Sequence, residues 1–226
     1  MMMARALPDR QWYTSRITWR KWLTEDVFAL GLQRPPDFQF TAGQRIRIRL
    51  AAEERDYSLI PGDRPEELEL LIRSMKEGLV SSYLSRCPVN TSLTFNGPSG
   101  HFIYRPSSRQ VVFAATGTGI APFTAMGRCG IKGFVMLHGV RHAADLYHRA
   151  LFESAATQFV ACLTGPTPPL PPSGAFAGRV TAYLRTGLAP GEYDFYLAGR
   201  REMIADAMAI IDDRFPASRV YTEIFF

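Results

Sequence analysis

The chain has 226 residues, a net charge of +5 and 46% hydrophobic residues. This length suits one large domain or two small ones, and the apolar share predicts a packed core and excludes a disordered chain. The positive charge is spread over both halves of the sequence without a basic block, so nucleic acid is not an expected partner. A mildly basic surface suits an acidic protein partner instead.

Three cysteines, Cys87, Cys129 and Cys162, are widely spaced, odd in number and lack a C-x-x-C pattern. They predict reduced thiols in a cytoplasmic protein and are too few for a four-cysteine iron–sulfur cluster. The first residues contain no apolar signal segment, and no run is long enough to span a bilayer, so we expect no membrane insertion. The three histidines within residues 138–148 lack partners at metal-binding spacing, so we expect no metal site and interpret them as structural or solvent-facing.

The first half has the pattern of an antiparallel β domain. Short alternating segments are separated by turns rich in proline, glycine and aspartate, which is typical of a small barrel. The clearest segment is Arg45–Leu50, in which arginine alternates with isoleucine or leucine. The six predicted strands are Tyr13–Arg20, Val27–Gln33, Arg45–Leu50, Tyr57–Ile60, Leu68–Arg73 and Ser92–Asn96.

Arg55-Asp56-Tyr57-Ser58 opens one of these strands. Alternation puts Arg55 and Tyr57 on one face and Ser58 on the other. An arginine, an aromatic ring and a hydroxyl together can bind a phosphate, stack on a ring and hydrogen-bond to it. On these four residues alone, an exposed arginine beside a core tyrosine is the favoured interpretation.

Two glycine turns follow. A strand ends near Arg73, and a short helix is predicted to begin after Gly78, near Ser81. A helix start with free serine hydroxyls is typical of an anion site, although the same residues also suit a capped helix that closes the barrel. The second turn, within residues 96–102, is interpreted on its own as a tight connection and no more.

The second half alternates strands and helices, which predicts a parallel sheet. We place the division between two domains at residues 1–106 and 107–226. The five predicted strands are Val111–Ala115, Phe134–His138, Gln158–Leu163, Asp194–Ala198 and Val220–Ile224. The predicted helices are Pro122–Arg128, Ala144–Ser154, Arg179–Thr186 and Glu202–Asp213.

The segment from Val111 to Pro122 organises the chain. An apolar β-branched run passes into Gly117-Thr118-Gly119 and then reaches a proline where a helix can begin. Glycines allow close approach of a phosphate, and the first helical N–H groups point at it. The motif has proline in place of the third glycine of the usual dinucleotide fingerprint, so on its own it is as consistent with an ordinary turn.

The end of the second parallel strand bears on the choice of nucleotide. An acidic residue there would hold a ribose 2′-hydroxyl, but the chain has Arg141 and His142, with no aspartate before Asp145. Arg141 and Arg179 suit a 2′-phosphate, which favours NADP(H) over NAD(H). A solvated arginine is the alternative.

Five motifs occur in a fixed order across nearly the whole chain: Arg55-x-Tyr57-Ser58, Gly78-x-x-Ser81, Gly97-Pro98-Ser99-Gly100-x-Phe102, Gly117-Thr118-Gly119-Ile120-Ala121-Pro122, and Glu223 followed by aromatics. This set resembles the ferredoxin–NADP(H) reductase family, most closely its bacterial flavodoxin/ferredoxin reductase branch. The resemblance implies a β + α/β fold with a six-stranded antiparallel flavin-binding barrel followed by a five-stranded parallel-sheet NADP(H)-binding domain.

The resemblance also implies roles for individual residues. Ser58, near flavin N5, and Glu223, near the nicotinamide, would be catalytic. A flavin would be held by Arg55, Tyr57, Ser58, Ile72, Arg73, Gly78, Val80, Ser81, Ser82, Phe225 and Phe226. NADP(H) would be held by Thr116, Gly117, Thr118, Gly119, Pro122, Arg141, Arg179 and Gly199.

The implied function is transfer of a hydride from NADPH to bound FAD and then of single electrons to a separate carrier such as ferredoxin or flavodoxin. FMN stays open because the compact chain leaves little room for an adenine-binding loop. The chain also departs from the family at Ala198-Gly199, where Cys-Gly is frequent. The alternatives are a reductase component of an oxygenase, a flavin or ferric reductase, or a non-catalytic flavin- or nucleotide-binding subunit.

Overall fold

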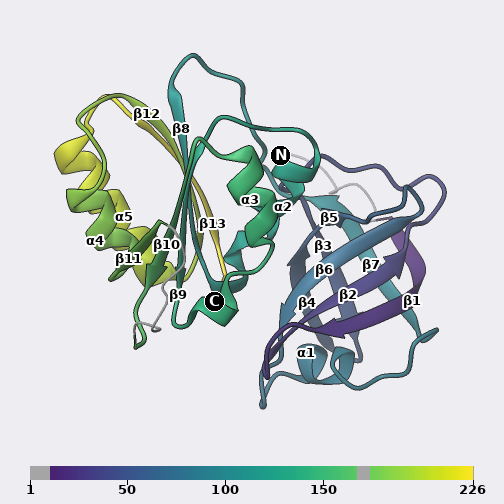
Figure 1. Ribbon diagram of the computed structural model, residues 1–226. Helices are drawn as coiled ribbons and strands as arrows, with labels where there is room; N and C mark the ends of the chain where they lie inside the picture. The colour runs from purple at the N-terminus through teal and green to yellow at the C-terminus, as the bar shows by residue number, and fades with distance from the viewer. Residues whose placement is uncertain (1–10, 167–173, 226) are drawn as a thin grey trace, which may run out of the picture.

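A computed structural model describes residues 11–166 and 174–225 of the protein. Within these ranges the N-terminal unit is an antiparallel sheet of seven strands that curls into a barrel, with one short helix, α1 (Leu79–Leu84), at its end (Figure 1). Neighbouring strands follow the order β4-β3-β7-β1-β2-β6-β5. The strands are β1 (Trp12–Trp22), β2 (Val27–Gln33), β3 (Arg45–Leu50), β4 (Glu53–Ser58), β5 (Ile60–Pro61), β6 (Glu67–Arg73) and β7 (Ser92–Ser99).

The C-terminal unit is a parallel sheet of six strands among the described residues, in the order β11-β10-β9-β8-β12-β13. Its strands are β8 (Gln110–Thr116), β9 (Val135–Val140), β10 (Gln158–Leu163), β11 (Ala175–Ala177), β12 (Tyr193–Gly199) and β13 (Arg219–Ile224). Its helical segments are η1 (Gly117–Ile120), α2 (Ala121–Arg128), η2 (Ala143–Asp145), α3 (Arg149–Ala155), α4 (Val180–Thr186) and α5 (Arg201–Arg214).

The alternation of side chains in the central strands explains why helices cover both faces of the parallel sheet. In β8, Phe113 and Ala115 point into one apolar cluster, and Val112 and Ala114 point into another. Side chains of α2 and α3 complete the first cluster, and those of α4 and α5 complete the second. The result is a three-layer arrangement in which α2 and α3 face the barrel and α4 and α5 face away (Figure 1).

The predicted class, an antiparallel barrel followed by a parallel sheet, is confirmed, but each sheet has one strand more than predicted. The segment predicted as Tyr57–Ile60 forms two strands: β4 begins at Glu53, because its charged residues pair with the arginines of β3, and β5 is only two residues long. The additional strand of the parallel sheet, β11, has three residues and pairs with β10. The predicted division after residue 106 falls in the connection between β7 and β8, and it stays a prediction.

The prediction of one continuous helix over Ala144–Ser154 is wrong. The chain forms the turn η2 and then α3, with His148 between them in the left-handed conformation at a φ of 52°. His148 Nε2 lies 3.5 Å from Glu69 of the barrel. This contact between the two units lies at the point where the helix is interrupted.

The barrel and the sheet are packed together by apolar and polar contacts. Val27, Leu71 and Phe102 of the barrel share one cluster with the α2 and α3 face of the sheet. Beside it, Arg128 at the end of α2 pairs with buried Glu69 at 2.8 Å. Burial raises the pKa of Glu69, and the positive charge of Arg128 opposes that rise. The junction therefore excludes water along much of its length, and this fixes the two units relative to each other.

Candidate functional site

The carboxyl ends of the parallel strands form one edge of the C-terminal sheet. The strand order reverses between β8 and β12, where the connections leave to opposite sides, and such a switch point opens a crevice. The loop after β8 begins at Thr116, turns through η1 and enters α2, with Pro122 in its first turn. The predicted loop and helix start are thus both at the switch point.

The glycines at this edge do two different things. An added Cβ at Gly119 would lie 2.6 Å from the Ala198 carbonyl oxygen and 2.8 Å from Gly199 Cα. One at Gly199, whose φ is +139°, would overlap the Thr116 hydroxyl. Gly117 also has a positive φ, +53°, but a Cβ there would meet nothing within 4 Å. Gly119 therefore lets the turn η1 lie against the end of β12, and Gly199 lets the end of β12 lie against Thr116 of β8, while Gly117 has open space around it.

His138 holds this loop from beneath. It lies in β9, is fully buried, and its Nε2 is 3.0 Å from the Gly117 carbonyl oxygen. Because a carbonyl only accepts, Nε2 carries the hydrogen. Burial lowers the pKa of His138 to about 4, so the ring is neutral at neutral pH. The sequence predicted a structural or solvent-facing role for this histidine, and the structure shows a structural one. Its contact with the loop was not predicted.

Arg141 and Arg179 both lie at the same edge of the sheet. Arg141 directly follows β9, Arg179 directly precedes α4, and both side chains are exposed. The backbone ties these ends together, since Gly165 N–H donates to the Arg141 carbonyl at 2.8 Å and Gly178 N–H to the Leu163 carbonyl at 2.8 Å. Within the described part of the chain, neither arginine forms an ion pair, so both guanidinium groups are available to an anion.

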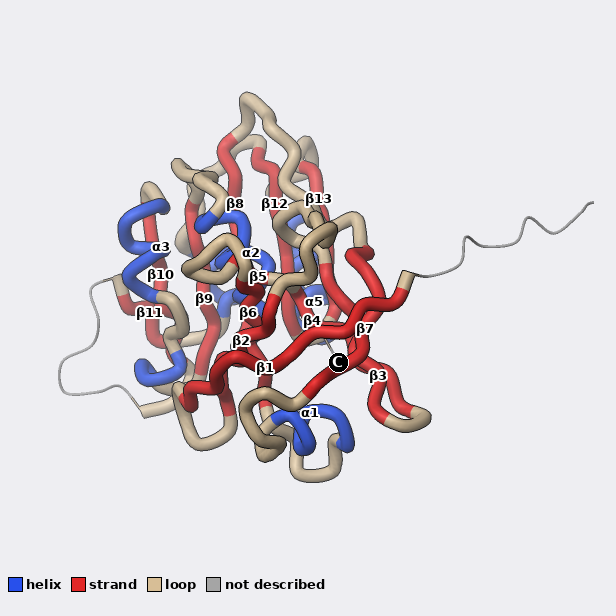
Figure 2. Tube along the Cα trace, turned by 90° about the vertical axis from the view of Figure 1, so that its right-hand side faces the viewer, coloured by secondary structure: helices blue, strands red, loops and turns tan. Residues whose placement is uncertain are grey.

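A cavity of about 570 Å³ lies between the barrel and the last strand of the sheet. Four of the predicted site residues line it: Arg55, Ser58, Glu223 and Phe225. They come from β4 and from the end of β13, which lies beside β3 of the barrel (Figure 2). The other lining residues are Arg45, Arg47, Glu54, Asp56, Thr222 and Ile224.

Ser58 is the buried polar group of this cavity. Its side chain is 4% exposed, and Oγ has no hydrogen-bond partner among the described residues. The register of β3 and β4 pairs Arg45 with Ser58 and Ile46 with Tyr57, so the serine and the tyrosine lie on opposite faces. Tyr57 packs against the barrel core and does not line the cavity. A buried hydroxyl without a partner carries a desolvation cost, which a bound ligand can offset.

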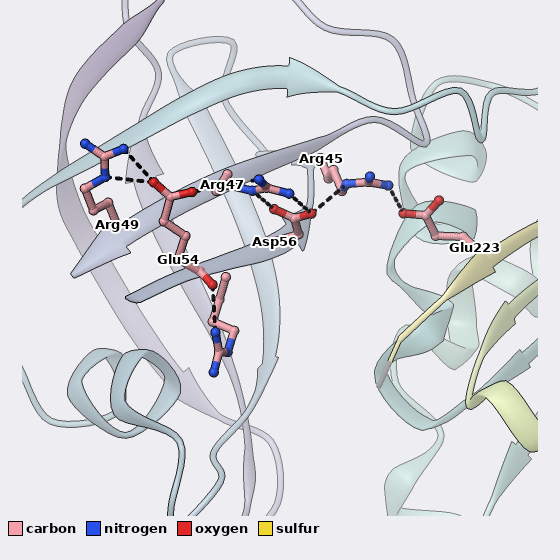
Figure 3. A network of polar contacts seen from close by, with 7 residues as sticks. Arg45, Arg47, Arg49, Glu54, Asp56 and Glu223 are labelled. Atoms are coloured by element: carbon pink, nitrogen blue, oxygen red, sulfur yellow. Dashed lines mark hydrogen bonds and ion pairs between the residues drawn. The ribbon is translucent and has the colours of Figure 1, made fainter. Parts of the chain in front are cut away.

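A row of alternating charges crosses the cavity wall (Figure 3). Arg47 pairs with Asp56 at 2.6 Å, Arg45 with Asp56 at 3.0 Å, and Arg45 with Glu223 at 2.5 Å. Burial acts to raise the pKa of Asp56, but Arg47 and Arg45 outweigh it, so the pKa is lowered. Burial raises the pKa of Glu223, against the opposing effect of Arg45. This row reaches from the barrel to the last strand of the sheet.

Arg45 is one of the six lining residues that were not predicted, and it is the one that contacts both domains. Alternation placed it on the polar face of its strand, but its partner Glu223 is 178 residues away. Arg55, which was predicted to contact phosphate, pairs with Glu53 at 3.1 Å and donates to the Glu54 carbonyl at 2.8 Å.

A second cavity, of about 590 Å³, lies around α1. Of the predicted site residues it is lined by Gly78 and Ser82, together with Lys76, Tyr83 and Arg86 among others. Ser81 is buried next to it, and its Oγ accepts a hydrogen bond from Met75 N–H at 3.1 Å.

The remaining predicted residues have other surroundings. Ile72 and Val80 lie in the barrel core, and Arg73 pairs with Asp26 at 2.8 Å. Phe225 packs at the junction of the two units, and its N–H donates to the Gly199 carbonyl at 2.8 Å. Phe226 lies outside the described residues.

Comparisons with known proteins agree with this arrangement. Residues 16–104 match the oxidoreductase FAD-binding domain family, and residues 113–209 match the oxidoreductase NAD-binding domain family. This chain belongs to the ferredoxin–NADP(H) reductase family. It thus combines an FAD-binding and an NAD-binding oxidoreductase domain, in the order that the motifs predicted.

Two curated relatives and one solved structure illustrate the range of the family. The chain is 31% identical over 208 residues to a toluate 1,2-dioxygenase electron transfer component from Pseudomonas putida, covering 85% of this chain and 61% of that protein. It is 30% identical over 165 residues to a flavodoxin/ferredoxin–NADP reductase from Rhodobacter capsulatus, covering 67% and 60%. A ferredoxin NADP⁺ reductase from Neisseria gonorrhoeae, solved with FAD and NADP, has the same fold, with a TM-score of 0.81 at 21% identity and coverage of 95% and 99%. The chain spans less than two thirds of the length of these two curated relatives.

Two further observations concern residues 11–166 and 174–225. None of their helices has the length and apolar character needed to cross a membrane. Their His, Cys, Asp and Glu side chains form no group of three or more that could hold a metal ion.

Measurements of the free energy of unfolding can test the different roles of Gly119 and Gly117. Gly119→Ala is expected to lower the free energy of unfolding by about 2–3 kcal/mol, because its Cβ meets backbone that cannot move aside. Gly117→Ala should cost only about 1 kcal/mol, the strain of a left-handed alanine. Gly130→Ala, at a φ of +89° with open space around it, is the matched control. Urea unfolding measures all three, and a Gly119→Ala effect no larger than that of Gly130→Ala would contradict the close approach of η1 and β12.

Proposed function

We propose that the protein is a flavin-dependent oxidoreductase that oxidises NADPH and delivers electrons to a separate carrier protein. The observation that carries this proposal is the cavity at the junction of the two domains. There a buried serine hydroxyl without a partner and a buried glutamate from the last strand line one space. A hydride-transferring flavoenzyme needs such a place, where groups from both nucleotide-binding domains meet.

The residues around this cavity fit a flavin. The Ser58 hydroxyl is available to hydrogen-bond to it, and Arg55 lines the same space. We assign Gly78, Ser81 and Ser82 to the flavin phosphates. The assignment of Tyr57 to packing against the ring rests on the sequence motif alone, because its side chain lies on the face opposite Ser58 and packs against the barrel core. The second cavity, beside α1, offers room for the second nucleotide half that FAD has and FMN lacks, which favours FAD over FMN. When bound, a flavin accepts a hydride and releases electrons one at a time.

The edge of the parallel sheet fits the nicotinamide nucleotide. We assign its pyrophosphate to the loop of Thr116 to Gly119, where Gly117 leaves open space and His138 fixes the carbonyl beneath. Gly199 and Pro122 shape the same crevice. For the 2′-phosphate we assign Arg141 and Arg179, both exposed at this edge.

The nearest carboxylate after β9 also favours NADPH over NADH. Asp145 accepts a hydrogen bond from His142 N–H at 3.0 Å, so it is engaged in a local turn instead of facing a ribose. An acidic residue available at this position would repel a 2′-phosphate.

The end of β13 serves the meeting point of the two ligands. We assign Glu223 to the positioning of charge and protons beside the nicotinamide. Phe225 packs at the same junction and is assigned to covering the flavin, a cover that has to move for the nicotinamide to stack. Phe226 is assigned the same role from the sequence alone.

The electron acceptor we propose is ferredoxin or flavodoxin. The support comes from the Rhodobacter capsulatus relative, a flavodoxin/ferredoxin–NADP reductase, and from the net charge of +5, which suits an acidic carrier. A cytoplasmic location accords with the free cysteines of the described chain.

A second candidate is the reductase component of an oxygenase. The relative from Pseudomonas putida favours it, since that protein is an electron transfer component of a dioxygenase and matches 85% of this chain. In that case the same cavity and crevice serve the same hydride transfer, and only the protein that accepts the electrons differs.

One spectrum tests the proposal. The purified protein is expected to be yellow, or to become so with added FAD, and to bleach anaerobically on addition of NADPH, more slowly with NADH. Protein that stays colourless with FAD would overturn the flavoenzyme assignment. Yellow protein that neither nucleotide bleaches would instead identify a non-catalytic binding subunit.

Ser58→Ala tests the role of the buried hydroxyl. The variant is expected to keep its flavin content but to slow single-turnover flavin reduction about tenfold, the worth of one hydrogen bond of about 1.4 kcal/mol. Ser154→Ala, on an exposed face of α3, is the control. Reduction at the wild-type rate in Ser58→Ala would count against the assignment.

Arg141→Ala tests the choice of nucleotide. The KM for NADPH is expected to rise about 10- to 100-fold, because a charge-assisted contact of about 1.5–3 kcal/mol is lost, while the KM for NADH stays unchanged. Arg185→Ala is the control, because it also removes an exposed positive charge and lies in the last turn of α4, the helix that Arg179 precedes. Equal losses with both nucleotides would show that Arg141 does not contact the 2′-phosphate.

A further inference from the structure

Arg45 is the one residue of the described chain that joins the carboxylates of the two domains. Its Nε lies 3.0 Å from Asp56 Oδ2 within the barrel, and its Nη1 lies 2.5 Å from Glu223 Oε1 on the last strand of the sheet (Figure 3). The guanidinium is planar and presents its N–H groups in fixed directions, so a hydrogen bond to Glu223 at one end and an ion pair with Asp56 at the other leave it little freedom. The position of Glu223 is thereby tied to the barrel.

The local backbone makes room for this arginine. Pairing between β3 and β7 shifts register between Arg45, which pairs with Ser99, and Arg47, which pairs with Asn96, so β7 carries one extra residue opposite this part of β3. Gly100, which directly follows β7 and has a φ of +101°, passes close to this side chain: a Cβ there would be 3.4 Å from Arg45 Nη1. The motif Gly97-Pro98-Ser99-Gly100, interpreted from the sequence as only a turn, thus lies beside the guanidinium that reaches Glu223.

The surroundings of Glu223 show why its contact with Arg45 matters for its charge. The glutamate side chain is only 13% exposed, and burial raises its pKa. The charged groups that face it are Arg45 of β3 and Asp56 of β4, the first lowering and the second raising that pKa. Arg47, Glu54 and Arg55 line the same cavity further along the row. Arg45 is therefore the group that offsets the cost of a charge at Glu223.

We propose that Arg45 is the positioning residue of the site: it holds the Glu223 carboxylate against the barrel wall, on the cavity that Ser58 lines. This inference rests on the proposed function for the reaction that Glu223 serves, while the ion pair itself belongs to the protein with or without that reaction. A pair that only fastened the two domains would also lower the pKa of Glu223, so the titration shows whether Arg45 controls the carboxylate, and the pH dependence of the reaction shows whether the site uses that control.

The first test needs no turnover. Glutamate side chains are labelled with ¹³C, and the Glu223 signal is assigned by its loss in Glu223→Gln and titrated by NMR in the protein as purified. Arg45→Gln is expected to raise the midpoint by about 1–2 pH units, because an opposite charge at this range lowers a carboxyl pKa by about that much. Arg45→Lys keeps the charge and should stay within about half a unit of wild type.

The matched control is Arg49→Gln, at the far end of the same row, which pairs with Glu54 and not with Glu223. It is expected to leave the Glu223 midpoint unchanged. An unchanged midpoint in Arg45→Gln would overturn the proposal, as would an equal shift in Arg49→Gln. If Arg45→Gln does not fold by circular dichroism, Arg45→Lys decides the matter, because a shift of a unit or more with the charge retained contradicts the assignment.

The second test reads the same group through the reaction. The rate of single-turnover flavin reduction by NADPH is measured as a function of pH. The part of this pH–rate profile that disappears in Glu223→Gln should shift to higher pH in Arg45→Gln, by the same amount as the NMR midpoint. Removing Arg45 raises the pKa of the carboxyl, so the rate changes at higher pH whichever protonation state is active. A profile that stays in place while the NMR midpoint moves would overturn the positioning role. Wild-type protein that neither nucleotide reduces would overturn the proposed function, and the NMR titration would still decide whether Arg45 controls Glu223.

Discussion

The apolar packing between the barrel and the α2 and α3 face of the sheet is the constraint on which the candidate site depends. Phe102 of the barrel connection packs against Phe123 of α2 with ring centroids 5.6 Å apart, and Phe123 in turn stacks on Phe113 of β8 at 4.6 Å. These rings are buried, so the orientation of the sheet relative to the barrel is fixed by close packing. That orientation brings the end of β13, an edge strand, to the outer face of β3 and β4. Without it the cavity between them has only one wall.

The charges across the cavity contribute to position more than to stability. The arginines of the row are one third to one half exposed, and pairs of that kind contribute little net free energy, because solvent screens them and ordering long side chains costs entropy. Their effect lies in geometry: each carboxylate is held between two guanidinium groups or between one guanidinium and a buried wall. The free energy that keeps the domains together comes from the aromatic junction, which leaves the row free to set where Glu223 lies.

The sequence predicted what depends on local pattern and missed what depends on distant partners. Apolar alternation in Arg45–Leu50 and the glycine loop at residues 117–119 were sufficient to predict the barrel strand and the helix start. The start of β4 was missed, because Glu53 and Glu54 have low strand propensity and Glu54 is held by its charge against Arg49 of β3. The role of Arg45 depends on Glu223, 178 residues away, and the break at His148 lies 3.5 Å from Glu69, 79 residues away; no local period points to either partner.

The loop at Gly117 and the carboxylate of Glu223 are joined by a short chain of backbone contacts. Thr116 Oγ1 accepts from Arg200 N–H at 3.1 Å, which ties the loop to the end of β12. One residue earlier, the Gly199 carbonyl accepts from Phe225 N–H at 2.8 Å, which ties the end of β12 to β13 just past Glu223. Glycine at position 199 is what permits both contacts, since a side chain there would displace Thr116. The departure from Cys-Gly to Ala198-Gly199 therefore leaves the supporting glycine in place and changes only the side chain before it. The loop, the strand end and Glu223 share this support, and Arg45 fixes Glu223 to the barrel. Both sides of the junction are therefore held at defined positions by the protein itself. Hydride transfer between two bound rings requires such an arrangement.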